Sequence, residues 1–166
     1  MSTPFGGVAL REGQVRARQE RVTDFLDGWG DLRVWDLGGD RDRRLLEFSL
    51  EAPGHDLAVE ARARYSEYYR RERGGSWRLT KYHYEYLDEA RARRLAYHLH
   101  DLGSRKMMPH AHCEDAAVLS SDEGKHHLRA VELDLREAHM QFMRLYASDS
   151  PPDCSAFLPL EIRRDT

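Results

Sequence analysis

Four of the chain's nine histidines lie close together in the segment AYHLHDLGSRKMMPHAHCE, residues 96–114. They form two His-x-His pairs, His98 with His100 and His110 with His112. Side chains alternate across a β-strand, so each pair would present both imidazoles on one side of an extended segment. Imidazole binds transition metals and also titrates near neutral pH. The cluster therefore predicts either a metal site or a proton-transfer site.

The metal interpretation uses all four imidazoles, from His98, His100, His110 and His112, as ligands of a tetrahedral zinc or another divalent ion. Cys113 would alternate away from the second pair if that segment is extended. The sequence also has no HExxH or CxxC spacing. Metal binding is therefore kept as an alternative.

The proton-transfer interpretation uses the same imidazoles in another way, to cleave RNA without a metal or any other cofactor. A pair of imidazoles can supply a general base and a general acid. Cations must also stabilise the charge that develops on the phosphate, and tyrosine rings can stack on unpaired bases. The predicted substrate-binding residues are Arg78, Arg94, His100, Arg105 and Lys106.

Composition restricts the class of protein. The chain has 166 residues, of which 40% are hydrophobic and 33% are charged, as expected for one globular domain with a core. Its net charge of −3 gives no global signature of nucleic-acid binding, although arginines crowd residues 62–78. Two cysteines and the lack of a long apolar run predict a cytoplasmic protein without a membrane segment.

Hydrophobic spacing predicts an α+β fold for a single domain over residues 1–166. An antiparallel β-meander of three to four strands within residues 45–113 packs against an N-terminal helix within residues 1–30 and a long C-terminal helix over residues 122–147. The last segment, residues 148–166, is expected to be an extended tail.

Alternating apolar and polar residues predict strands over residues 45–50, 57–65, 77–88 and 93–100, with Gly74-Gly75 as a tight hairpin loop. A three-residue turn at Asp88–Ala90 would place Thr80 opposite His98 and Arg78 opposite His100.

That register has consequences for the tyrosines of the third strand. It puts Tyr82, Tyr84 and Tyr86 on the same face as His98 and His100, and leaves Leu95, Tyr97 and Leu99 for the core. A slip of one residue would exchange the faces. Tyrosine stripes in strands are common because an aromatic ring suits a half-buried pleated surface, so the favoured interpretation of these three tyrosines is structural.

The segment from about Leu57 to Glu114 resembles the TumE family of small bacterial toxins from toxin–antitoxin operons. The resembling segment covers roughly a third of the chain, and the resemblance is carried by KYHYEY (81–86), AYHLHD (96–101) and MPHAHCE (108–114). It implies a compact sheet-and-helix protein with a cognate antitoxin and with activity on RNA. The matching positions, which the resemblance implies as catalytic residues, are His98, His110 and His112, with Tyr84 as a fourth.

A non-catalytic interaction module is the third interpretation. The predicted C-terminal helix is followed by AFLPLEI (156–162), which is apolar enough to dock on a protein partner or on a second copy in a homo-oligomer.

Overall fold

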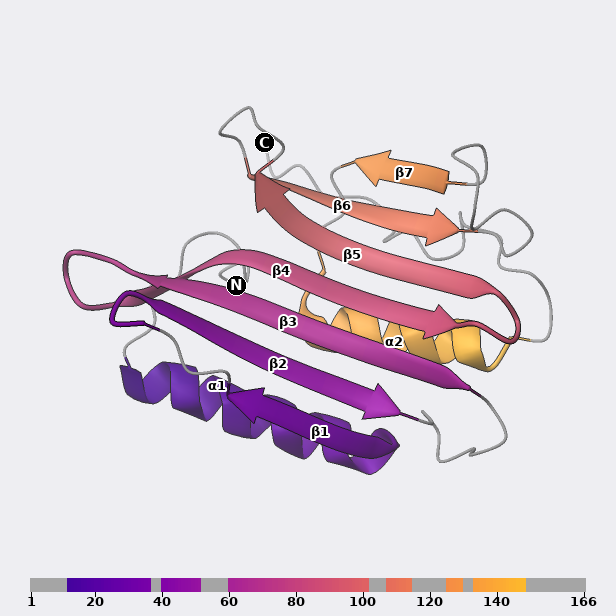
Figure 1. Ribbon diagram of the computed structural model, residues 1–166, viewed down its shortest axis with the longest axis horizontal. Helices are drawn as coiled ribbons and strands as arrows, with labels where there is room; N and C mark the ends of the chain where they lie inside the picture. Colours follow the sequence, from indigo (N-terminus) through magenta and orange to yellow (C-terminus); the bar gives the residue numbers. More distant parts are fainter. Residues whose placement is uncertain are drawn as a thin grey trace, which may run out of the picture.

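The computed structural model describes residues 12–36, 40–51, 60–101, 107–114, 125–129 and 133–148 (Figure 1). These residues form an α+β fold with one seven-stranded antiparallel sheet, in the strand order β1-β2-β3-β4-β5-β6-β7. The elements in chain order are α1 (Glu12–Leu26), η1 (Asp27–Trp29), β1 (Asp31–Asp36), β2 (Arg43–Glu51), β3 (Ala61–Arg71), β4 (Trp77–Asp88), β5 (Arg93–Asp101), β6 (Met107–Glu114), β7 (Lys125–Arg129) and α2 (Leu135–Tyr146). In the described ranges, no helix has the length and apolar character needed to cross a membrane.

The sheet is larger than the predicted meander of three to four strands. The predicted strands at 45–50, 77–88 and 93–100 correspond to β2, β4 and β5. The strand predicted at 57–65 is displaced toward the C-terminus, because β3 begins at Ala61 and continues to Arg71, while residues 57–59 lie outside the described residues. The structure adds β1 at one edge, and β6 and β7 at the other.

Both helices cover the same face of the sheet. Arg18 of α1 contacts Glu67 of β3, and His139 of α2 contacts Tyr65, two residues away on the same strand. Residues two apart on a strand share a face. We call the face covered by the helices the inner face and the opposite one the outer face. Figure 1 shows α1 beside β1 and β2, and α2 behind β3 and β4.

The hairpin between β3 and β4 forms at the predicted Gly74-Gly75 pair. Gly75 has a φ of +80°, and its backbone N–H donates to the Glu72 carbonyl at 2.9 Å. Glycine reaches this left-handed conformation without the steric penalty that a Cβ atom would add. The turn therefore forms at the predicted position, but its loop has five residues, 72–76, between the paired Arg71 and Trp77, and is not the tight loop that was predicted.

The predicted register between β4 and β5 is wrong by three residues. Leu87 pairs with Arg94, and His98 lies opposite His83, not opposite Thr80. The connecting turn is longer than expected, because Glu89–Ala92 all lie outside the strands. An odd shift exchanges the two faces of one strand relative to the other. The tyrosines of β4 therefore share a face with the Leu95 side of β5, and not with His98.

Two β4–β5 arginines hold this turn against the end of α2. Arg91 donates to the Tyr146 carbonyl at 2.8 Å, and Arg93 donates to the Leu145 carbonyl at 3.0 Å. The last carbonyls of a helix have no partner within the helix, so cationic donors stabilise them. These contacts tie the β4–β5 turn to a distant part of the chain.

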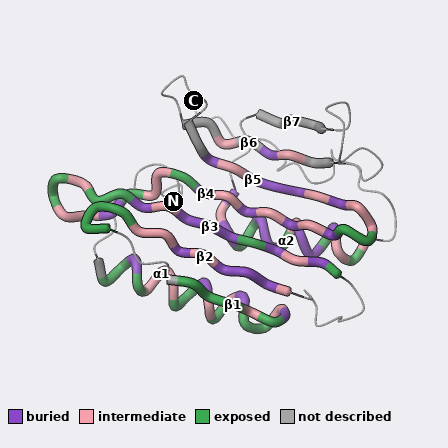
Figure 2. The backbone as a smooth tube through the Cα atoms, viewed as in Figure 1, coloured by how far each residue is buried: buried purple, intermediate pink, exposed green. Residues whose placement is uncertain are grey.

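The core is an aromatic layer between the inner face and the helices. Tyr82, Tyr84 and Tyr86 are fully buried, which confirms a structural role for the tyrosine stripe. Phe142 of α2 packs against β4 and β5: its ring centroid lies 6.0 Å from that of Tyr86 and 5.8 Å from that of Tyr97. Figure 2 shows buried positions along β2, β3, β4 and β5 and in both helices.

A histidine of α2 is part of this core. The Nδ1 atom of His139 lies 2.7 Å from the Tyr65 hydroxyl oxygen, and its ring makes edge contacts with Phe25 and Trp29. Burial lowers the pKa of His139 to about 4. His139 is therefore neutral near pH 7 and joins α1 and η1 to α2 by packing.

A β-bulge in β4 explains why the odd-numbered Trp77 is buried at the start of this strand and even-numbered residues are buried after it. Tyr68 pairs with Lys81 and Tyr69 pairs with Leu79, so Thr80 is an extra residue in the ladder. One inserted residue reverses the alternation of side chains. Trp77, at an odd position before the bulge, is consequently buried, as are the even-numbered tyrosines after it.

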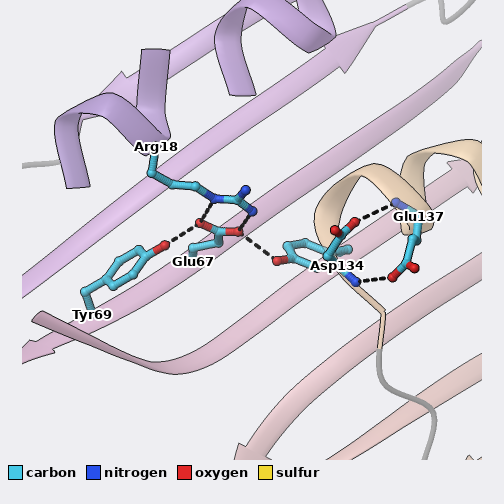
Figure 3. Close-up of polar contacts among 6 residues, drawn as sticks. Arg18, Glu67, Tyr69, Asp134 and Glu137 are labelled. Atoms are coloured by element: carbon cyan, nitrogen blue, oxygen red, sulfur yellow. Dashed lines mark hydrogen bonds and ion pairs between the residues drawn. The ribbon is translucent and has the colours of Figure 1, made fainter. Parts of the chain in front are cut away.

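The C-terminal helix is shorter than the predicted range 122–147. Residues 125–129 form β7, and α2 begins only at Leu135. Asp134 caps the helix: its side chain accepts the Glu137 backbone N–H at 2.8 Å, while the Glu137 carboxylate accepts the Asp134 N–H at 2.8 Å (Figure 3). This reciprocal capping box satisfies two backbone donors at the start of a helix and fixes where α2 begins.

The start of α2 can be tested by substituting Asp134 with Ala. We expect Asp134→Ala to lower the free energy of unfolding by about 1 kcal/mol, because a capping side chain is lost. Urea unfolding measures the change, with Met140→Ala on the exposed side of α2 as the control. A helix that continued through residue 134 would instead be stabilised, by up to about 0.7 kcal/mol, because Ala is the better helix former.

Candidate functional site

Three half-buried histidines from consecutive strands form a row on the outer face: His83 of β4, His98 of β5 and His112 of β6. The ring centroids of His83 and His98 lie 4.2 Å apart, and those of His98 and His112 lie 4.9 Å apart. We call these three residues the imidazole ladder. Strand pairing creates it, because His83 is the register partner of His98 and β6 lies next to β5.

The predicted four-histidine cluster is brought together in part. His98 and His112 are in ring contact, as the proton-transfer interpretation requires. The backbone of His110 is the register partner of His98, and that of His100 pairs with Met108. The side chains of His100 and His110 lie outside the described residues.

His83 was not among the predicted site residues. The register error caused the omission, because the predicted register placed Thr80 opposite His98, where the structure has His83. A local signal was present in KYHYEY, where His83 and Glu85 alternate with three tyrosines. Once the tyrosines are assigned to the core, alternation places both residues on the outer face.

Two charged residues adjoin the ladder. The Nε atom of Arg94 lies 2.6 Å from Oε1 of Glu85, and the same oxygen lies 4.0 Å from Nε2 of His83. Arg94 was predicted to bind substrate, and the structure pairs it with a carboxylate beside the ladder. Glu85 thus lies where it can orient the His83 ring.

The remaining predicted residues do not join the ladder in the described part of the chain. Tyr84 lies on the inner face, where its hydroxyl donates to Glu67 at 2.8 Å. Arg78 is exposed near the β3–β4 hairpin and binds Glu72 at 2.5 Å, while the pairing of β4 with β5 begins only at Tyr82. Arg105 and Lys106 lie outside the described residues.

Within the described ranges, no group of three or more His, Cys, Asp and Glu side chains is arranged to hold a metal ion. The predicted metal set includes His100 and His110, whose side chains lie outside those ranges. The zinc alternative therefore stays a prediction.

A basic pocket of about 580 Å³ lies where β2, β3 and β4 meet. Its described lining includes four cationic side chains and no acidic one. Lys81 of this pocket precedes His83 by two residues on β4, so the pocket and the ladder share the outer face. Sequence reasoning missed Arg43 and Arg44, because GGDRDRR (38–44) reads as a polar loop.

A buried carboxylate, Glu67, lies on the inner face among its hydrogen-bond donors (Figure 3). Glu67 is fully buried and accepts hydrogen bonds from Arg18 at 2.6 and 3.2 Å, from Tyr69 at 2.7 Å and from Tyr84 at 2.8 Å. Burial alone would raise the pKa of Glu67, but the charge of Arg18 and the hydrogen bonds from Arg18 and both tyrosines lower it below its ordinary value. The network fixes α1 to β3 on the inner face, and the ladder lies on the opposite face of the sheet.

Comparison with known proteins adds no assignment: no protein-family model matches the chain, and neither does any curated protein or solved structure.

The Glu67 network predicts a specific loss of stability in acid. A lowered carboxyl pKa stabilises the fold above the unfolded-state value near 4.5, and this contribution is lost as the pH falls through the lower folded-state value. We expect Glu67→Gln to cost about 3–5 kcal/mol at pH 7, because Arg18 loses its partner in a partly buried site. The variant should also show a weaker pH dependence of unfolding below pH 4.5.

The double substitution Arg18→Met/Glu67→Gln is the matched control. It removes the orphaned charge and keeps an amide oxygen as acceptor for both tyrosines, so it should be more stable than Glu67→Gln alone. Chemical denaturation between pH 3 and 7 measures all three proteins. If Glu67→Gln unfolds like the wild-type chain across this range, the carboxylate does not hold α1 to the sheet.

Proposed function

We propose that the protein is a toxin-like ribonuclease that cleaves single-stranded RNA on its outer face by histidine general acid/base catalysis. The observation that carries the proposal is the ring contact of His98 and His112, at 4.9 Å, on the face that also bears the basic pocket. Two imidazoles this close can both reach one phosphodiester, since catalytic hydrogen bonds span roughly 2.6–3.2 Å.

Each ladder residue has a role in this scheme. One imidazole of His98 and His112 takes the proton of a ribose 2′-hydroxyl, whose oxygen attacks the adjacent phosphorus. The other gives a proton to the 5′-oxygen as the P–O5′ bond breaks, which leaves a 2′,3′-cyclic phosphate. His83 is a positioning residue, because it contacts His98 and lies beside Glu85. The reaction requires no metal.

A cognate antitoxin belongs to the proposal as the partner that the TumE resemblance implies. A charged, half-buried face with an active site gives such a partner a defined surface to block. The non-catalytic interaction module and the zinc protein are the alternatives that an activity measurement separates.

We expect His98→Gln and His112→Gln each to reduce cleavage of a single-stranded RNA by about 10²–10⁴-fold, because each removes one proton-transfer group. His83→Gln should cause a smaller loss, since His83 acts through His98. Rates on a fluorescent RNA, with product analysis for a 2′,3′-cyclic end, measure the effect. The rate should be bell-shaped in pH and unaffected by EDTA.

Arg16→Ala is the control for these variants, because Arg16 is exposed on α1, in the helix layer that covers the inner face. Melting temperatures within a few degrees of the wild-type value would show that the glutamine variants fold. Full activity in both His98→Gln and His112→Gln would contradict the proposal. Activity lost in EDTA and restored by zinc would support the metal alternative instead.

A further inference from the structure

The basic pocket combines positive charge with an aromatic ring. Its lining includes Arg43 and Arg44 of β2, Tyr68 and Arg70 of β3, and Lys81 of β4. Anionic ligands with a flat, apolar part match such a lining, and a nucleotide has both a phosphate and a base.

The β-bulge shapes this pocket. Thr80, the inserted residue, lines it, and the Thr80 hydroxyl donates to the Tyr68 carbonyl at 3.1 Å. The bulge leaves Lys81 directly opposite Tyr68. Bulges are typical of places where a strand must redirect side chains next to a functional site.

Three of the cations are not neutralised by described residues. Arg43, Arg70 and Lys81 are exposed, and none of them forms an ion pair with any other residue that the structure describes. Arg43 and Arg70 are direct register partners. Like charges directly opposite each other destabilise a sheet, and a bound phosphate would remove that repulsion.

Tyr68 supplies the surface for a base. Its ring is half-buried at the pocket, and the Lys81 ammonium lies 4.9 Å from the ring centroid. A cation over an aromatic face is held by a weak attraction, worth about 0.5–1 kcal/mol at an exposed site. Lys81 can therefore move onto a phosphate while a base takes its place over the ring.

We propose that the basic pocket is an RNA subsite in which Tyr68 stacks on an unpaired base and Arg43, Arg70 and Lys81 bind the adjoining phosphate. This subsite rests on the proposed ribonuclease function and deepens it. Lys81 and His83 are two residues apart on one strand, which is about 6.6–6.8 Å. The nucleotide in the pocket would thus lie next to the phosphodiester at the ladder.

The test uses a chain that binds RNA without cutting it. His98→Gln/His112→Gln serves as the background, and fluorescence anisotropy of a 5′-labelled single-stranded RNA gives Kd at several salt concentrations. We expect Arg43→Ala/Arg70→Ala to lower the slope of log K against log salt by about 1.4 and to weaken binding about 25-fold at 0.1 M salt, because each lost phosphate contact contributes about 0.7 to the slope.

The aromatic contribution has a different signature. Tyr68→Leu should weaken binding by roughly fivefold or more and leave the salt slope unchanged, because stacking involves no ion release. Tyr68→Phe keeps the ring and should bind like the background chain. A duplex of the same sequence should bind less tightly than the single strand, since its bases are not free to stack.

Arg16→Ala/Arg144→Ala is the charge-matched control, because it removes two exposed arginines from the helix layer. Equal weakening by this control and by Arg43→Ala/Arg70→Ala would overturn the subsite, as would unchanged binding by Tyr68→Leu. The two proposals fail separately. RNA that binds through the pocket but is never cut by the wild-type chain refutes the ribonuclease alone, whereas cutting without any effect of the pocket variants refutes the subsite alone.

Discussion

The pairing of β4 with β5 sets both the core and the candidate site. In β4 the even positions from Tyr82 to Tyr86 are buried, and the odd positions His83 and Glu85 lie on the outer face. Alternation makes these two sets inseparable, because one residue of slip would exchange them. The register that buries three tyrosines against the helices is therefore the register that brings His83 to within 4.2 Å of His98. The hydrophobic effect on one face thus fixes the geometry of the imidazole ladder on the other.

The inner face also contains a polar centre that ties the helix layer to the sheet. Glu67 has four donors for one buried carboxylate, and burial raises the pKa of Tyr84 well above its ordinary value, so that its hydroxyl stays a donor. A buried charge is tolerated only when its partners are complete. Tyr69 belongs both to this network and to the lining of the basic pocket. The pocket lining thus combines a tyrosine held by the buried network with exposed cations.

Local sequence patterns predicted where helices and strands lie better than they predicted how the strands pair. The alternation in residues 77–88 gave both ends of β4, and helical spacing gave α1, because each signal is contained within one element. The β4–β5 register was missed because the turn has four residues, 89–92, and not three; Arg91 and Arg93 also bind carbonyls of α2, more than fifty positions away. The spacing around Leu128 fits a helix, yet residues 125–129 pair with β6; the Asp134–Glu137 capping box was the local signal for the true start. His98 and His112 were predicted together, and His83 was lost with the register.

The outer side of β4 gives the proposed site a direction. Lys81, His83 and Glu85 follow one another at two-residue steps, so a cation, an imidazole and a carboxylate lie in a row about 6.6–6.8 Å apart. A polyanion laid along this row is attracted at Lys81 and repelled at Glu85, and this repulsion is reduced by Arg94. Such a gradient favours one placement of a phosphate chain over the reverse one. Because the tyrosines between these positions are buried in the core, the strand cannot slip to present a different order of charges on the outer face.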